Sequence, residues 1–182
     1  MHFSRTCPHP TRRLTAARDA PLPPSVNGIL PSQSVVPMNT VLIVCTHNSS
    51  RSQMAEGLLR ARYGDRYEVH SAGTEPGGVN PFAVEVMAEL DIDLSHHTSD
   101  HVYAYTDRSL DVVVTVCDDA AESCPYVQAQ KQNLHRGFED PSAVTGTDDE
   151  KRAAFRRVRD EIADWIDATF GPKEPEERSS TS

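Results

Sequence analysis

The sequence contains few lysines, few cysteines and no long apolar run, and each shortage excludes a class of protein. Only three lysines stand against 27 acidic residues, and the formal net charge is −9. A nucleic acid partner is therefore not expected, because the phosphate backbone binds basic surfaces. No apolar run approaches the ~20 residues that a membrane-spanning helix needs, so we expect no membrane segment.

The four cysteines are too few, in 182 residues, for the disulfide framework of a small secreted domain. The N-terminus has no signal-peptide pattern, so we interpret them as thiols of a cytoplasmic protein that are catalytic or bind a metal. The hydrophobic content of 37% is that of a globular chain, and the length suits one α/β domain with additional terminal segments.

The composition divides the chain into three parts. Residues 1–37 hold seven of the 13 prolines and show no apolar periodicity, which predicts a disordered extension. Met38 directly precedes the first apolar run, which favours a miscalled start upstream of it. We expect the folded domain at 38–171 and a disordered, polar tail at 172–182. Cys7, in the extension, has no assigned role.

Strand-like and helix-like segments alternate within the domain. Unbroken apolar runs are typical of strands in a parallel sheet that is covered on both faces. The predicted strands are 40–45, 67–74, 110–117 and a short one within 133–141, and the predicted helices are 52–64, 80–90 and 147–171. This alternation predicts a parallel, doubly wound sheet.

Helix-start signals support the last two helices. Asn80 is the predicted cap of the segment that begins with Pro81, since Asn is favoured at that position and Pro at the next. Thr147 and Glu150 have the spacing of a capping box. An apolar stripe follows on the last helix, at Phe155, Val158, Ile162, Trp165 and Ile166.

Two cysteines end predicted strands. Cys45 closes the run "VLIVC" and Cys117 closes "VVVTVC". Since the carboxyl ends of parallel strands gather at one edge of a sheet, where such folds bind ligands, we expect both thiols at that edge.

The loop from Cys45 to Arg51 has the features of an anion trap. Backbone N–H groups of residues 46–51, at the start of a helix, can surround a tetrahedral oxyanion, and Arg51 can bind two of its oxygens. The same positive field favours a thiolate nucleophile at Cys45. Nearby hydroxyls, those of Ser49, Ser50 and Ser52, can donate to the sulfur or cap the helix. The alternative is an inert buried thiol before an ordinary helix start.

The stretch "CTHNSSRSQMAEG" resembles the anion-binding loop of low-molecular-weight protein tyrosine phosphatases and of the arsenate reductases that share their fold. The resemblance implies a three-layer α/β sandwich with a central, mainly parallel four-stranded sheet flanked by helices. It implies a substrate-binding loop made of Thr46, His47, Asn48, Ser49, Ser50, Arg51 and Ser52. Many members carry glycine where His47 stands, which a positive φ at that position would explain. Otherwise His47 faces solvent or tunes Cys45.

Two further motifs distinguish the phosphatase branch from the reductase branch. "FEDPSA" provides Asp140 as the acid that either branch needs, but Ser142 stands where phosphatases usually carry an aromatic residue. "VVTVCDDAAESCP" resembles the redox segment of thioredoxin-coupled arsenate reductases, with Cys117 and Cys124 as its two thiols. A zinc site is not expected there, because Cys-x6-Cys lacks the usual close spacing.

The resemblance implies a cytoplasmic enzyme that reduces arsenate to arsenite. Cys45, Arg51 and Asp140 would react with arsenate, and Cys117 and Cys124 would carry a disulfide to thioredoxin. Phosphate or sulfate would compete, and the protein would be a monomer. No cofactor would be required, although family members suggest a potassium site, which would lie at Asn48, Glu56, Ser71, Thr98 and Asp100. The alternatives are a protein tyrosine phosphatase and a non-catalytic thiol sensor of redox state or arsenite.

Overall fold

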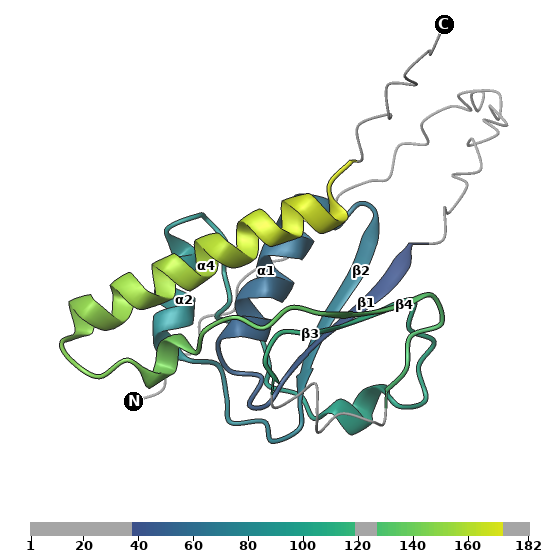
Figure 1. The fold of residues 1–182 in the computed structure, drawn as a ribbon, viewed down its shortest axis with the longest axis horizontal. Helices are drawn as coiled ribbons and strands as arrows, with labels where there is room; N and C mark the ends of the chain where they lie inside the picture. The colour runs from purple at the N-terminus through teal and green to yellow at the C-terminus, as the bar shows by residue number, and fades with distance from the viewer. Residues whose placement is uncertain (1–37, 119–126, 173–182) are drawn as a thin grey trace, which may run out of the picture. The chain divides into compact units, whose positions relative to one another are not determined.

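A four-stranded parallel sheet forms the centre of the domain. The structure is a computed structural model that describes residues 38–118 and 127–172. The strands are β1 (Asn39–Cys45), β2 (Tyr67–Gly73), β3 (Val112–Thr115) and β4 (Gln132–His135). Their order is β2-β1-β3-β4, and every neighbouring pair is parallel (Figure 1). The predicted extension at 1–37, Cys124 and residues 173–182 of the tail lie outside the described residues.

Within residues 38–118 and 127–172, three α-helices with assigned bounds accompany this sheet. They are α1 (Arg51–Tyr63), α2 (Pro81–Ala88) and α4 (Asp148–Phe170), and two 3-10 helices are η1 (Val102–Tyr105) and η2 (Pro141–Ala143). α1 packs against β1 and β2, and α4 runs across α1 and α2 (Figure 1). This arrangement confirms the predicted α/β architecture. In the described part of the chain, no helix has the length and apolar character of a membrane span.

The core forms where the apolar patterns predict it. Val41 to Val44 are all buried, as expected of a parallel strand at the centre of a sheet. On α4 the stripe predicted from the sequence is buried, except that Trp165 is only partly covered. Its ring makes edge-to-face contacts with Phe138 and Phe170.

Both predicted helix starts are present. The Asn80 side chain accepts a hydrogen bond from the Phe82 amide, with Pro81 at the first helical position. Thr147 and Glu150 form the complete capping box of α4. The Thr147 amide donates to the Glu150 carboxylate, which lowers the pKa of that group below its ordinary value.

The strand order places a crevice at the carboxyl edge of β1 and β3. β1 lies between β2 and β3, so the connections leaving these strands diverge, and ligands bind at such a switch point. Cys45 is the last residue of β1. β3 ends at Thr115, so Cys117 lies two residues beyond the strand instead of ending it. β4 ends at His135, which leaves Asp140 on the connection that follows.

We expect Phe155→Ala to lower the free energy of unfolding by about 3–5 kcal/mol, because it empties a fully buried site between α4 and Phe82. Urea denaturation measures the change. Asp164→Ala, on the exposed side of the same helix, serves as the control and should stay within about 0.5 kcal/mol of the wild type. Equal stability of the two variants would contradict this packing of α4.

Candidate active site

The carbonyl groups of the loop after β1 point away from its centre. Most of them accept hydrogen bonds from the chain between β2 and α2, at 2.8 to 3.3 Å. The acceptors are the carbonyls of Cys45, Thr46, His47 and Ser49, and the donors are the amides of Thr74, Glu75, Gly77 and Asn80. The loop is therefore supported from outside by a neighbouring segment.

Because the carbonyls point outward, the amides of the loop face inward. The Asn48 amide donates to the sulfur of Cys45 at 3.1 Å. The amides of His47, Ser49 and Ser50 have no acceptor within the described ranges 38–118 and 127–172. A ring of free N–H groups at the start of a helix is suited to a tetrahedral oxyanion.

The thiol of Cys45 lies at the base of this loop, with only 3% of the residue exposed. Ser52 Oγ lies 2.9 Å from the sulfur and accepts a hydrogen bond from Asn48 Nδ2 at 3.0 Å. With its oxygen already accepting, the Ser52 hydroxyl can direct its proton at Cys45. The Asn48 amide and the Ser52 hydroxyl are thus both aimed at the sulfur, where they stabilise negative charge.

Asn48 holds the shape of the loop from within. Its backbone is left-handed, with φ of 46°, a conformation that asparagine adopts more readily than most residues. The buried side-chain amide donates to Ser52 and Ser71 and accepts from the Asp100 amide and from Gln53 Nε2. All four hydrogen-bonding positions of the amide are filled.

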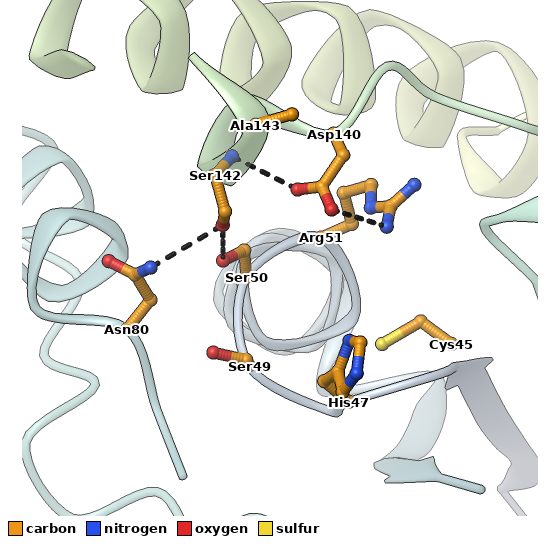
Figure 2. A pocket seen from close by; sticks show the side chains of 9 residues that line it. All are labelled: Cys45, His47, Ser49, Ser50, Arg51, Asn80, Asp140, Ser142 and Ala143. Carbon is orange, nitrogen blue, oxygen red and sulfur yellow. Dashed lines mark hydrogen bonds and ion pairs between the residues drawn. The ribbon is translucent and has the colours of Figure 1, made fainter. Parts of the chain in front are cut away.

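His47 does not take the positive φ considered for it from the sequence, since the left-handed residue is its neighbour Asn48. The His47 side chain is exposed, and it lines the same cavity as Cys45 (Figure 2). An exposed imidazole at this point leaves the loop geometry unaffected, because the Asn48 backbone makes the turn.

Arg51 and Asp140 face the same cavity from two different elements (Figure 2). Arg51 begins α1, and its side chain, 13% exposed, donates to the Phe138 carbonyl at 3.0 Å. Its second terminal nitrogen lies 3.3 Å from the Asp140 carboxylate, which is 40% exposed. The cavity measures about 310 Å³ and is lined by Cys45, His47, Ser49, Ser50, Arg51, Asn80, Asp140, Ser142 and Ala143.

A second buried thiol lies against the loop. Cys117 is 2% exposed, and its sulfur is 3.4 Å from the hydroxyl of Thr46, the residue that follows Cys45. Both Cys45 and Cys117 are free thiols. Two buried thiols at the carboxyl edge of the sheet allow redox chemistry, whereas nucleophilic attack on a bound anion requires only one of them.

The residues predicted to bind potassium gather behind the loop. Glu56, Ser71, Thr98 and Asp100 line a second cavity of about 200 Å³, and Asn48 reaches Ser71 from the buried side. Carboxylate and carbonyl oxygens are suitable donors for a hard cation.

A cation is already present in this second cavity. Arg60 lines it and pairs with the Glu56 carboxylate, whose other oxygen accepts from Ser71. Nearby, burial lowers the pKa of His97, whose ring bonds to the Gln53 side chain. A potassium ion would have to compete with Arg60 for Glu56, so the potassium site stays a prediction.

Sequence reasoning missed two features of the site. Gly73 ends β2, where a Cβ would lie 2.6 Å from the Thr46 carbonyl oxygen and 2.9 Å from the Asn48 amide. The available signal is a glycine near the end of the predicted strand 67–74. The sequence distinguishes Ser142 only as a non-aromatic residue after Asp-Pro, whereas in the structure its hydroxyl bonds to that of Ser50.

A parallel α/β sheet, an anion-binding loop from Cys45 to Arg51 and a facing aspartate together define a cysteine-dependent phosphatase fold. A family model agrees with this class. The chain belongs to the low molecular weight phosphotyrosine protein phosphatase family, whose model matches residues 40–171.

Within that family, the chain is similar to proteins named arsenate reductase. It is 50% identical over 126 residues to one from Halalkalibacterium halodurans, which covers 69% of this chain and 91% of that protein. A solved arsenate reductase in its phosphate-binding state is 32% identical, with a TM-score of 0.62 over 72% of this chain and 95% of that one. The thioredoxin-dependent arsenate reductase Cg_ArsC1' of Corynebacterium glutamicum is 27% identical in sequence. Its TM-score is 0.58, and the match covers 75% of this chain and 62% of that one.

We expect Gly73→Ala to weaken anion binding strongly and to destabilise the domain by about 1–3 kcal/mol, because the new methyl group meets loop backbone that cannot move cheaply. Protection of Cys45 from alkylation by inorganic phosphate measures the binding. Gly77→Ala is the matched control, since a Cβ at that position meets nothing within 4 Å. Equal protection in both variants would contradict the proposed close approach.

The potassium site can be tested by comparing thermal unfolding in KCl and in NaCl at equal concentration. We expect the same Tm in both salts for the wild type, because Arg60 already pairs with Glu56. Arg60→Gln should make the Tm higher in KCl, since the carboxylate then lacks its cation. A potassium-specific rise in the wild type would show that the ion binds despite Arg60.

Proposed function

We propose that this chain is an arsenate reductase that uses three cysteines in sequence and is regenerated by thioredoxin. One observation carries the proposal: the buried Cys117 thiol contacts the residue next to Cys45, at the edge of an anion-binding loop. A phosphatase of this fold has no use for a second thiol in that place. The similarity to proteins named arsenate reductase supports the same reaction.

The first step is nucleophilic attack on arsenate. The loop amides and Arg51 hold the oxyanion, and the Cys45 thiolate attacks arsenic. The departing oxygen takes a proton from Asp140 and leaves as water. The Arg51–Asp140 contact supports this assignment, because it places the acid at the cavity before the anion binds.

The second step transfers two electrons. The Cys117 thiolate attacks the sulfur of Cys45, a Cys45–Cys117 disulfide forms and the sulfur–arsenic bond breaks. The electron pair of that bond stays on arsenic, which leaves as arsenite. The contact between Cys117 and Thr46 supports an attack from this side of the loop.

The third step regenerates the nucleophile. Cys124 attacks Cys117, which frees the Cys45 thiolate and forms a Cys117–Cys124 disulfide. A thioredoxin dithiol then reduces this disulfide by exchange. Cys124 lies outside the described residues, so its role rests on the resemblance of "VCDDAAESCP" and on the thioredoxin-dependent relative.

Other anions should bind at the same loop. Phosphate is close to arsenate in size and charge, and a similar reductase is known in a phosphate-binding state. We therefore propose that phosphate and sulfate compete with arsenate and that the enzyme hydrolyses aryl phosphates weakly. A monomer in the cytoplasm remains our expectation.

The cysteine steps can be separated by measuring arsenate-dependent NADPH consumption with thioredoxin and thioredoxin reductase. Cys45→Ser should abolish the activity, because no adduct forms. Cys124→Ser should form about one arsenite per enzyme, measured directly as arsenite, but should consume no NADPH, since its Cys45–Cys117 disulfide stays buried away from thioredoxin. Cys7→Ser, in the N-terminal extension, is the matched cysteine control and should behave as the wild type.

Three outcomes would overturn parts of the proposal. Sustained turnover by Cys124→Ser would exclude the three-cysteine sequence. Efficient phenyl phosphate hydrolysis that survives Cys117→Ser, without arsenate reduction, would identify a phosphatase. Arsenite binding without any turnover would identify a thiol sensor, although such a sensor leaves Arg51 and Asp140 without a purpose.

A further inference from the structure

Ser50 stands at the start of α1 but does not cap it. A serine at this position normally accepts a hydrogen bond from an amide of the first helical turn. Here the side chain makes no such bond, and its backbone has φ of −123° and ψ of −80°. The buried Ser50 hydroxyl instead lies 3.0 Å from the hydroxyl of Ser142, which is 92 residues further along the chain.

Ser142 belongs to the turn that carries the acid. Its backbone amide donates to the Asp140 carboxylate at 3.0 Å, so the acid and the Ser142 hydroxyl are held in one short unit. The Asn80 side chain, at the start of α2, reaches the same hydroxyl at 3.4 Å (Figure 2). The start of α1, the start of α2 and the acid turn thus meet at Ser142.

Arg51 also binds the acid turn, but it has a second task. Its guanidinium contacts Asp140 at 3.3 Å, and the same fork faces the oxyanion cavity. A bound oxyanion competes for this fork, because arginine binds such anions through two parallel hydrogen bonds. The Arg51–Asp140 contact is therefore weakest when the acid is needed.

We propose that Ser50 and Ser142 are positioning residues, whose paired hydroxyls hold Asp140 over the anion loop while the oxyanion engages Arg51. The inference rests on the proposed function for the identity of the oxyanion. We call the hydrogen bond between the Ser50 and Ser142 hydroxyls the tether. Its proposed role applies to any reaction in which a tetrahedral oxyanion is bound and an acid protonates the leaving oxygen. Among the described residues, the Ser50 hydroxyl bonds to that of Ser142, which also accepts from the Asn80 side chain.

The decisive measurement is the single-turnover rate of arsenite formation at saturating arsenate. Ser50→Ala and Ser142→Ala should each lower this rate about tenfold, which is part of the 10²–10⁴ that a well-placed acid contributes. The double variant should be no slower than either single variant, since both remove one interaction. Ser142→Thr keeps the hydroxyl and should restore most of the rate.

The background of Asp140→Asn separates positioning from general support of the loop. Without the acid there is nothing left to position, so neither serine substitution should lower the rate further. Ser109→Ala, an exposed serine outside the site, should match the wild type. Phosphate protection of Cys45 from alkylation should be nearly unchanged in the serine variants, which verifies that the loop is intact.

Two results would overturn the inference while leaving the proposed function standing. One is a wild-type rate in both Ser50→Ala and Ser142→Ala. The other is a full tenfold loss that persists in the Asp140→Asn background. If the wild type reduces no arsenate, the proposed function fails, and hydrolysis of phenyl phosphate and p-nitrophenyl phosphate tests the tether. The serine variants should then lose more activity with phenyl phosphate, whose poorer leaving group depends more on the acid, and equal losses would refute the tether.

Discussion

The buried side chain of Asn48 is the constraint on which the site depends. Its amide has two donor and two acceptor positions, and the surrounding chain fills all four. An unpaired amide at this depth would be costly, so the loop has one arrangement that satisfies it. That arrangement turns the Asn48 backbone left-handed, sends the loop carbonyls outward and leaves the amides facing the cavity. Nucleophile, anion pocket and helix start therefore come into place together.

Two arginines, Arg51 and Arg60, carry the positive charge near the loop, and each contacts more than one group. Arg51 binds the acid turn through both Phe138 and Asp140 and still faces the oxyanion cavity. Behind the loop, Arg60 balances Glu56, so the buried polar network carries its own cation. The Ser50 and Ser142 hydroxyls add a hydrogen bond between uncharged groups. An entering anion does not compete for it as it competes for Arg51. A site that binds a dianion thus keeps its acid in place without relying on a single ion pair.

Much of the fold follows from local patterns. The buried run of β1, the Asn80 cap and the Thr147–Glu150 capping box are short-range features, and each element begins or ends within a few residues of its predicted place. The parallel sheet follows from the alternation of these elements. Cys45 and Arg51 could also be found, because the chemistry of an anion loop needs a thiol and a guanidinium at that spacing. In these elements, the structure that the local sequence favours is the one that the whole fold adopts.

The amino-acid sequence alone is enough to assign the main elements, the anion-binding loop and the cysteines that are candidates for a redox reaction. How distant residues meet can be learned only from their arrangement in three dimensions. The contacts of Gly73 with the loop, of Ser142 with Ser50 and of Cys117 with Thr46 join positions between 25 and 92 residues apart. No periodicity or spacing encodes such contacts, because they depend on the order of strands in the sheet and on the path of each connection. A hydroxyl that tethers an acid therefore looks, in the sequence, like any other surface serine.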